Sequence, residues 1–173
     1  MSTSHLPPNS PSVRVSGRVV VISRGPAQTQ AIGKAVGTMA RAGDVILLVG
    51  GLGSGKTCLT QGILWGLGVN EYARSPTFVL VSQYRGRLPL YHVDLYRLDA
   101  EAEIADLELE EYLFGDGVCV VEWAEKARGI YQSQRLLVEL DILDEMTRRL
   151  TLTALGERYA ELIQAVAAMD LKG

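Results

Sequence analysis

The segment with the clearest chemistry runs from Gly50 to Thr57, where GGLGSGKT satisfies the pattern G-x-x-x-x-G-K-[ST]. Glycines let such a loop adopt positive φ angles and turn its N–H groups inward, without a Cβ to block phosphate oxygens. The ammonium group of Lys56 can reach β- and γ-phosphates, and the hydroxyl group of Thr57 is placed to ligate magnesium. The pattern therefore predicts binding of a nucleoside triphosphate with magnesium, and it favours hydrolysis of that triphosphate.

The residues around this loop supply the context that phosphate binding requires. Before it, Val45–Val49 is a continuous apolar run, typical of a strand buried on both faces of a parallel sheet. After it, the sequence predicts a helix from about Lys56 to Leu67, whose free N–H groups and positive dipole end would face the phosphates. The nucleotide-binding residues predicted from this segment are Gly51, Leu52, Gly53, Ser54, Gly55, Lys56, Thr57 and Cys58.

Two acidic residues follow predicted strands and are candidates for the magnesium side of the site. Glu122 closes the apolar run Val118–Val121, and Asp94 follows Leu90–Val93. An acid at the carboxyl end of a strand lies beside the crevice in which α/β sheets bind ligands. Position alone leaves the two carboxylates interchangeable, and an ordinary exposed acid stays open for each. His92, inside the second strand, is more typical of a structural histidine than of a catalyst.

The order of the predicted elements indicates an α/β fold with a sheet of mixed direction, because strands alternate with helices and two strands form a hairpin. That hairpin is expected between Phe78–Tyr84 and Leu88–Asp94. Gly33 and Gly37 lie four residues apart in a helix expected over Ala27–Ala40, a spacing that permits close packing between helices. The other expected elements are a strand at Val19–Ile22, a mostly helical acidic segment at Ala100–Leu113, strands at Leu136–Ile142 and Arg149–Leu155, and a closing helix at Glu157–Met169.

The composition bounds the organisation and the environment of the chain. With 173 residues, 47% of them hydrophobic, it is expected to form one domain over residues 13–173 after a disordered tail at residues 1–12. The net charge of -3 and the pI of about 5.4 exclude a global basic field that would hold nucleic acid unaided. No apolar run approaches the roughly 20 residues of a membrane span. We therefore expect a cytoplasmic protein without a membrane partner, whose Cys58 and Cys119 are small core residues.

Several further segments, in this order and spacing, resemble one family. They are Ser75–Phe78, Tyr91–Leu98, Leu107–Tyr112 and Val121–Trp123. Together with the P-loop they are similar to the bacterial TsaE (YjeE) family, the ATPase component of tRNA threonylcarbamoyladenosine biosynthesis. The resemblance covers roughly Gly43 to Glu125. It implies ATP and Mg²⁺ as ligands and a three-layer P-loop NTPase fold with partly antiparallel strands.

The resemblance also implies partners and residue roles. The family works with the TsaD and TsaB proteins, which install the threonylcarbamoyl group on adenosine 37 of ANN-decoding tRNAs, so contact with tRNA would be indirect. Lys56 and Thr57 match the family's phosphate and magnesium residues. Thr77 matches the threonine of its switch-like loop, and Asp94 matches its strand-end aspartate. The remaining matches, to the magnesium-side glutamate and the tryptophan that follows it, are Glu122 and Trp123.

The chain departs from the family pattern at three positions and leaves two other functions to weigh. Gly51 replaces a usual aspartate, Glu108 a usual glycine, and Ala124 a frequent proline. The alternative function is a P-loop small-molecule or nucleoside kinase, which needs an acceptor pocket and usually an arginine-bearing lid that the chain does not obviously offer. A regulatory GTPase would need the guanine-reading motif N-K-x-D, but the only asparagines, Asn9 and Asn70, are followed by Ser and Glu.

Overall fold

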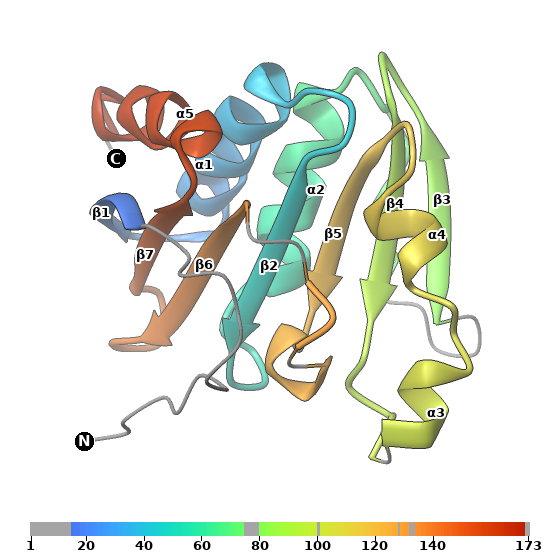
Figure 1. The fold of residues 1–173 in the computed structure, drawn as a ribbon. Helices are drawn as coiled ribbons and strands as arrows, with labels where there is room; N and C mark the ends of the chain where they lie inside the picture. The colour runs from blue at the N-terminus through green and yellow to red at the C-terminus, as the bar shows by residue number, and fades with distance from the viewer. Residues whose placement is uncertain (1–14, 75–79, 100, 128, 132–133, 172–173) are drawn as a thin grey trace.

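The computed structural model describes residues 15–74, 80–99, 101–127, 129–131 and 134–171, so the predicted tail at residues 1–12 lies outside the described residues. A sheet of seven strands forms the centre of the molecule, and helices cover its faces (Figure 1). The elements in chain order are β1 (Val15–Ser23), α1 (Pro26–Met39), β2 (Val45–Gly50), α2 (Lys56–Gly66), β3 (Val81–Arg85), β4 (Pro89–Asp94), α3 (Glu101–Ala105), α4 (Glu110–Leu113), β5 (Val118–Glu122), the 3₁₀ helix η1 (Ala124–Ala127), β6 (Arg135–Ile142), β7 (Arg148–Leu155) and α5 (Glu157–Ala167).

The strand order β1-β7-β6-β2-β5-β4-β3 confirms the predicted α/β fold with a mixed sheet. The four central strands, β6, β2, β5 and β4, are parallel to one another. The outer pairs β3–β4, β6–β7 and β7–β1 are antiparallel. Short turns connect β3 to β4 and β6 to β7, whereas parallel neighbours require longer crossovers. As a result, β2 lies in the middle of the sheet with a parallel strand on each side.

The two faces of the sheet pack against different helices, which produces three layers. Ile46 and Leu48 of β2 belong to the apolar core that contains residues of α1, α2 and α5. Val45 and Leu47 alternate with them and join the second core, with residues of α3, α4 and η1. Burial of β2 on both faces explains its uninterrupted apolar sequence. Among the described residues, none of the helices has both the length and the apolar character to cross a membrane.

Helices α1 and α2 approach so closely that glycine backbones meet glycine backbones. A Cβ built at Gly33 would lie 2.3 Å from the carbonyl oxygen of Leu59, and one at Gly37 would lie 2.2 Å from that of Ile63. In the other direction, a Cβ at Gly62 would lie 2.1 Å from the carbonyl oxygen of Gln30. The close packing predicted from Gly33 and Gly37 is therefore confirmed, and α2 supplies glycines of its own.

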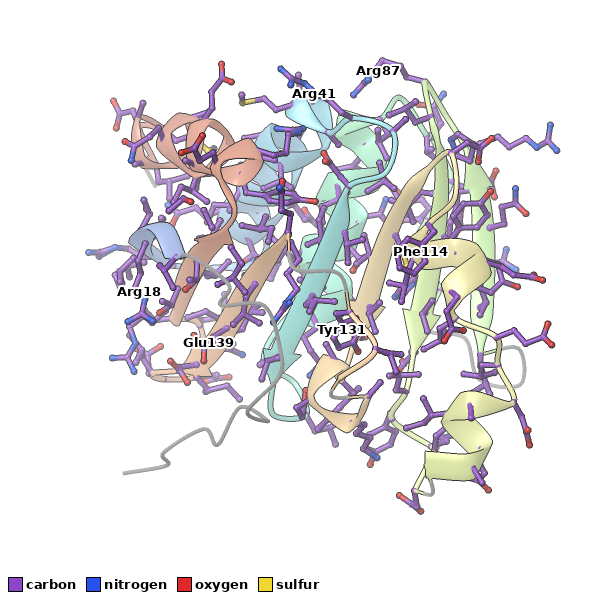
Figure 2. The ribbon with its side chains drawn as sticks, in the orientation of Figure 1. Arg18, Arg41, Arg87, Phe114, Tyr131 and Glu139 are labelled. Carbon is purple, nitrogen blue, oxygen red and sulfur yellow. The ribbon has the colours of Figure 1, made fainter. Side chains whose placement is uncertain are left out.

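The end of α1 is tied to the β3–β4 turn by one arginine. The Nη2 atom of Arg87 donates hydrogen bonds to the carbonyl oxygens of Gly37, Thr38 and Ala40, at 3.1, 3.3 and 2.9 Å. A cation at a helix C-terminus satisfies free carbonyl groups and opposes the negative end of the helix dipole. Figure 2 shows Arg87 and Arg41 at the same end of the sheet, which is opposite to the end where β2 runs into the P-loop.

The structure differs from the sequence predictions most clearly in three segments. The acidic segment from Ala100 to Leu113 is mostly helical, as predicted, but the helix is interrupted, so that two short helices, α3 and α4, form. Glu108 lies between them at a φ angle of 49°, in the left-handed region, and a helix cannot continue through that conformation. Strand β1 begins at Val15, before the expected Val19. Strand β3 begins at Val81, and the expected start at Phe78 lies outside the described residues.

Candidate functional site

The sheet topology brings the carboxyl ends of β2, β5 and β4 to one edge. Glu122 at the end of β5 pairs with Leu48 of β2 on one side and with Asp94 of β4 on the other. The two predicted carboxylates therefore lie on neighbouring strands, beside the loop that follows β2. The sequence could place each acid at a strand end, but only the strand order makes β4 and β5 neighbours.

The loop from Gly50 to Lys56 has the backbone shape that its glycines permit. Gly53 and Gly55 have φ angles of 76° and 102°, which residues other than glycine rarely adopt. A Cβ at Gly50 would lie 2.7 Å from the carbonyl oxygen of Leu140, so this glycine lets the loop leave the sheet against β6. This glycine-shaped loop leads directly into the first turn of α2, as the motif predicts.

Lys56 lies inside this loop and is 5% exposed. Its Nζ atom donates hydrogen bonds to the carbonyl oxygens of Gly50 and Gly51, at 2.6 and 2.9 Å. The same atom lies 4.1 Å from the centre of the Trp123 ring, a cation–π contact. Burial lowers the pKa of the Lys56 ammonium group below its usual value, and nearby carboxylates, first that of Glu122, oppose this shift.

Thr57 and Glu122 face each other across the first turn of α2. The Thr57 hydroxyl group lies 3.0 Å from Oε1 and 3.3 Å from Oε2 of Glu122. Glu122 is buried, with an exposed fraction of 2%. A hydroxyl oxygen beside a carboxylate is a donor set of hard oxygens, which suits Mg²⁺. Among the described residues, no group of three or more His, Cys, Asp or Glu residues could hold a metal ion by itself. Thr57 and Glu122 are therefore residues that would hold Mg²⁺ together with other ligands.

Two aromatic side chains, Tyr96 and Trp123, line the other side of the site and are called the aromatic wall below. The rings of Tyr96 and Trp123 lie 5.0 Å apart, and the Tyr96 N–H donates a 3.0 Å hydrogen bond to Oδ1 of Asp94. Trp123 has a φ angle of 57°, an uncommon conformation for a bulky side chain that stores backbone strain. This conformation immediately follows Glu122. Through this backbone conformation, the consecutive side chains of Glu122 and Trp123 both line the same cavity.

These groups enclose a cavity of ≈ 260 Å³. It is lined by the segment from Leu52 to Cys58 together with Asp94, Tyr96, Glu122 and Trp123. The predicted nucleotide and metal residues other than Gly51 line this cavity, whereas the carbonyl oxygen of Gly51 accepts a hydrogen bond from Lys56. The predicted switch residue Thr77 lies outside the described residues.

Three further residues of this site were not predicted from the sequence. His92 lies 3.1 Å from Oε1 of Glu122, whereas its strand position indicated only a structural histidine. Thr60 also contacts Glu122, and its position one turn after Thr57 on the same helix face was a usable signal. Tyr96 lines the cavity two residues after Asp94, but no local pattern distinguished it from other surface tyrosines.

The chain is similar to known proteins of one family. The model of the family described as "Threonylcarbamoyl adenosine biosynthesis protein TsaE" matches residues 23–150. The chain belongs to the TsaE family. It is 42% identical over 146 residues to the tRNA threonylcarbamoyladenosine biosynthesis protein TsaE of Bacillus subtilis, covering 84% of this chain and 91% of that protein. It is 38% identical over 130 residues to TsaE of Treponema pallidum, covering 75% and 96%.

A solved structure of this family has the same architecture. The crystal structure of Bacillus subtilis YdiB superposes with a TM-score of 0.76 and 35% sequence identity, and the match covers 87% of this chain and 95% of that chain. The fold is therefore that of a P-loop NTPase, and the chain is a TsaE-family protein of tRNA threonylcarbamoyladenosine biosynthesis.

Proposed function

We propose that this TsaE-family protein binds ATP with Mg²⁺ at the P-loop and hydrolyses it. In this role it supports threonylcarbamoylation of adenosine 37 in ANN-decoding tRNAs, together with TsaD and TsaB. The observation that carries the proposal is the convergence of Lys56, Thr57 and Glu122 on one cavity at the carboxyl edge of the parallel strands. Each of the three has the chemistry that triphosphate binding requires.

The charges of the cavity support the involvement of a divalent cation. The described lining residues include one basic side chain, Lys56, and two acidic ones, Asp94 and Glu122, so acidic groups outnumber basic ones. A triphosphate alone would be repelled by the two carboxylates. Thr57 and Glu122 would hold Mg²⁺, which would supply positive charge to offset the carboxylates and the triphosphate.

Lys56 would recognise the phosphates directly. Its ammonium group already lies against the loop carbonyls and is almost fully removed from water, where an interaction with a phosphate oxygen is stronger than at the surface. Burial lowers the pKa of this ammonium group, and the nearby carboxylates, first that of Glu122, oppose the shift. The loop N–H groups are already oriented by the backbone, so they would bind the remaining phosphate oxygens without having to reorient.

Asp94 and Trp123 would act on the other side of the phosphates. Asp94 is 7% exposed and lines the cavity, and we assign it the orientation of the attacking water. Trp123 covers the Lys56 ammonium group and would contact the nucleotide from the aromatic wall. Thr77 remains our prediction for the switch residue that responds to the γ-phosphate.

The partners and the place of action follow from the proposed pathway. TsaD and TsaB would provide the site of threonylcarbamoyl transfer, and this chain would reach tRNA only through that assembly. The net charge of -3 supports such an indirect role, because a protein that held tRNA by itself would present a basic surface. Since tRNA modification takes place there, we place the protein in the cytoplasm, without a membrane partner.

The proposal is tested by measuring phosphate release from ATP and from GTP, with and without TsaB–TsaD and tRNA. Lys56→Ala should lower Mg²⁺-dependent ATP turnover by about 100-fold or more, because it removes a fixed positive charge from the transition state. Lys34→Ala, which removes an exposed lysine of α1, is the matched control and should retain the wild-type rate. Both variants should keep the wild-type circular dichroism spectrum. Undiminished turnover in Lys56→Ala would refute the assignment of the phosphate site.

A further inference from the structure

Glu122 is surrounded by donors in the interior of the protein. Its Oε1 atom lies 3.0 Å from the Thr57 hydroxyl group, 3.1 Å from Nε2 of His92 and 3.4 Å from the Thr60 hydroxyl group. His92 has an exposed fraction of 0%, so water does not compete for these contacts. Oε2 is less engaged, with a contact of 3.3 Å to Thr57.

The sheet register places His92 beside Glu122. Leu90, His92 and Asp94 point to one face of β4, because side chains alternate along a strand. In the parallel pairing of β4 with β5, His92 is opposite Val120 and Asp94 is opposite Glu122. The histidine therefore reaches the glutamate diagonally, from two residue pairs deeper in the sheet.

The polar chemistry of His92 is directed at this one carboxylate. Among the described residues, Nδ1 is buried and has no hydrogen-bond partner, whereas Nε2 contacts Glu122. An ionised carboxylate only accepts hydrogen bonds, so the contact requires a proton on Nε2. A buried imidazole with an unsatisfied nitrogen costs stability, and an apolar residue on this face of β4 would avoid that cost. Its one polar contact is therefore the feature that needs a functional account.

The two threonines cannot replace this donor. The Thr60 hydroxyl group has one proton, and it donates this proton to the carbonyl oxygen of Lys56 at 2.9 Å, one turn back along α2. Its 3.4 Å contact with Glu122 is therefore secondary. Thr57 lines the cavity and would turn its oxygen towards the metal ion. His92 is the donor among the three that belongs to neither α2 nor the phosphate loop.

We propose that His92 is a positioning residue that holds Oε1 of Glu122 and leaves Oε2 available to Mg²⁺. This inference rests on the proposed function, in which Glu122 is the magnesium-side acid. The physical reason is that a hydrogen-bonded partner behind a ligating group fixes its orientation before the metal ion arrives, and loss of such partners weakens metal binding. His92 does not touch the nucleotide in this role, so it acts only through Glu122.

The test compares His92→Phe, which removes the donor, with His92→Gln, whose side-chain amide can place an N–H near the position of Nε2. In the full-length protein, the affinity for fluorescently labelled ADP is measured during a magnesium titration and again in EDTA. His92→Phe should raise the magnesium concentration at half-effect by about 10-fold or more, with little change in EDTA. His92→Gln should return it towards the wild-type value. Leu90→Val, a buried position on the same face of β4, controls for loss of stability and should keep the wild-type magnesium dependence.

Three outcomes would overturn the inference. The first is a wild-type magnesium titration for His92→Phe, and the second is an equal loss of affinity with magnesium and with EDTA, which would indicate a structural role. The third is His92→Gln behaving like His92→Phe. If His92→Phe does not fold, His92→Asn takes its place, because its shorter amide cannot reach Oε1 of Glu122. If wild-type protein itself shows no magnesium dependence, the proposed function fails and this inference fails with it.

Discussion

A single methyl group added between α1 and α2 should damage the nucleotide site from a distance. Gly62 lies in the middle of α2, and a Cβ there would be 2.1 Å from the carbonyl oxygen of Gln30 and 2.9 Å from the backbone N of Lys34. Both are backbone atoms, so no side-chain rotation can relieve the contact. Gly62→Ala therefore requires the two helices to move apart. Helix α2 carries Lys56 and Thr57 in its first turn, and it would move with them.

Two effects of opposite sign decide how much Gly62→Ala changes the free energy of unfolding. Alanine is a better helix former than glycine, and this alone would stabilise α2 by about 1 kcal/mol. Overpacking a tight contact costs roughly 1–3 kcal/mol, and contact between backbones belongs at the upper end of that range. The net expectation is a loss of about 2 kcal/mol in the free energy of unfolding. For a chain of this length, such a loss lowers the melting temperature by roughly 4–8 °C.

The assay is thermal unfolding followed by circular dichroism, with ADP affinity measured at a temperature where the variant is folded. Gly51→Ala is the control for stability, because a Cβ there would meet no atom within 4 Å. We expect the control to keep the wild-type melting temperature and Gly62→Ala to lose both stability and nucleotide affinity. A melting temperature of Gly62→Ala equal to or above that of the wild type would show that helix propensity outweighs the contact. The account of the α1–α2 interface would then be wrong.

Two further predictions concern the strand-end acids and the turn before α4. Glu122→Gln should lower magnesium-dependent ADP affinity about 10-fold, whereas Asp94→Asn should leave this affinity unchanged and reduce ATP turnover about 100-fold. A magnesium titration of both variants checks this prediction. The opposite pattern would exchange the roles of the two acids. Glu108→Gly should raise the melting temperature. A left-handed residue other than glycine destabilises the folded state by roughly 1–2 kcal/mol, which exceeds the roughly 0.5–1 kcal/mol that glycine loses through its greater entropy in the unfolded chain. Glu110→Gly, within α4, should lower it, and a rise in both would contradict the assignment of strain to Glu108.

Much of the fold could be predicted because its signals are local. The apolar run before Gly50 predicted β2, and the turn between β3 and β4 predicted their antiparallel pairing, which the structure confirms. The acidic segment is mostly helical, as predicted, but its helix-forming residues give no sign that Glu108 adopts a left-handed conformation and interrupts the helix. The conformation does coincide with the departure from the family's usual glycine, so the resemblance contained a signal that propensity alone did not.

The sequence by itself determined the phosphate loop, because eight consecutive residues contain the whole of its chemistry and their order sets their spacing in space. It also determined that Asp94 and Glu122 end strands. The tertiary structure decided that those strands are neighbours, that Trp123 covers Lys56, and that His92 and Glu122, 30 residues apart in the chain, share a hydrogen bond. The physical reason is that strand order and register result from the packing of the whole sheet. No local pattern of residues encodes which side chains that packing will bring into contact.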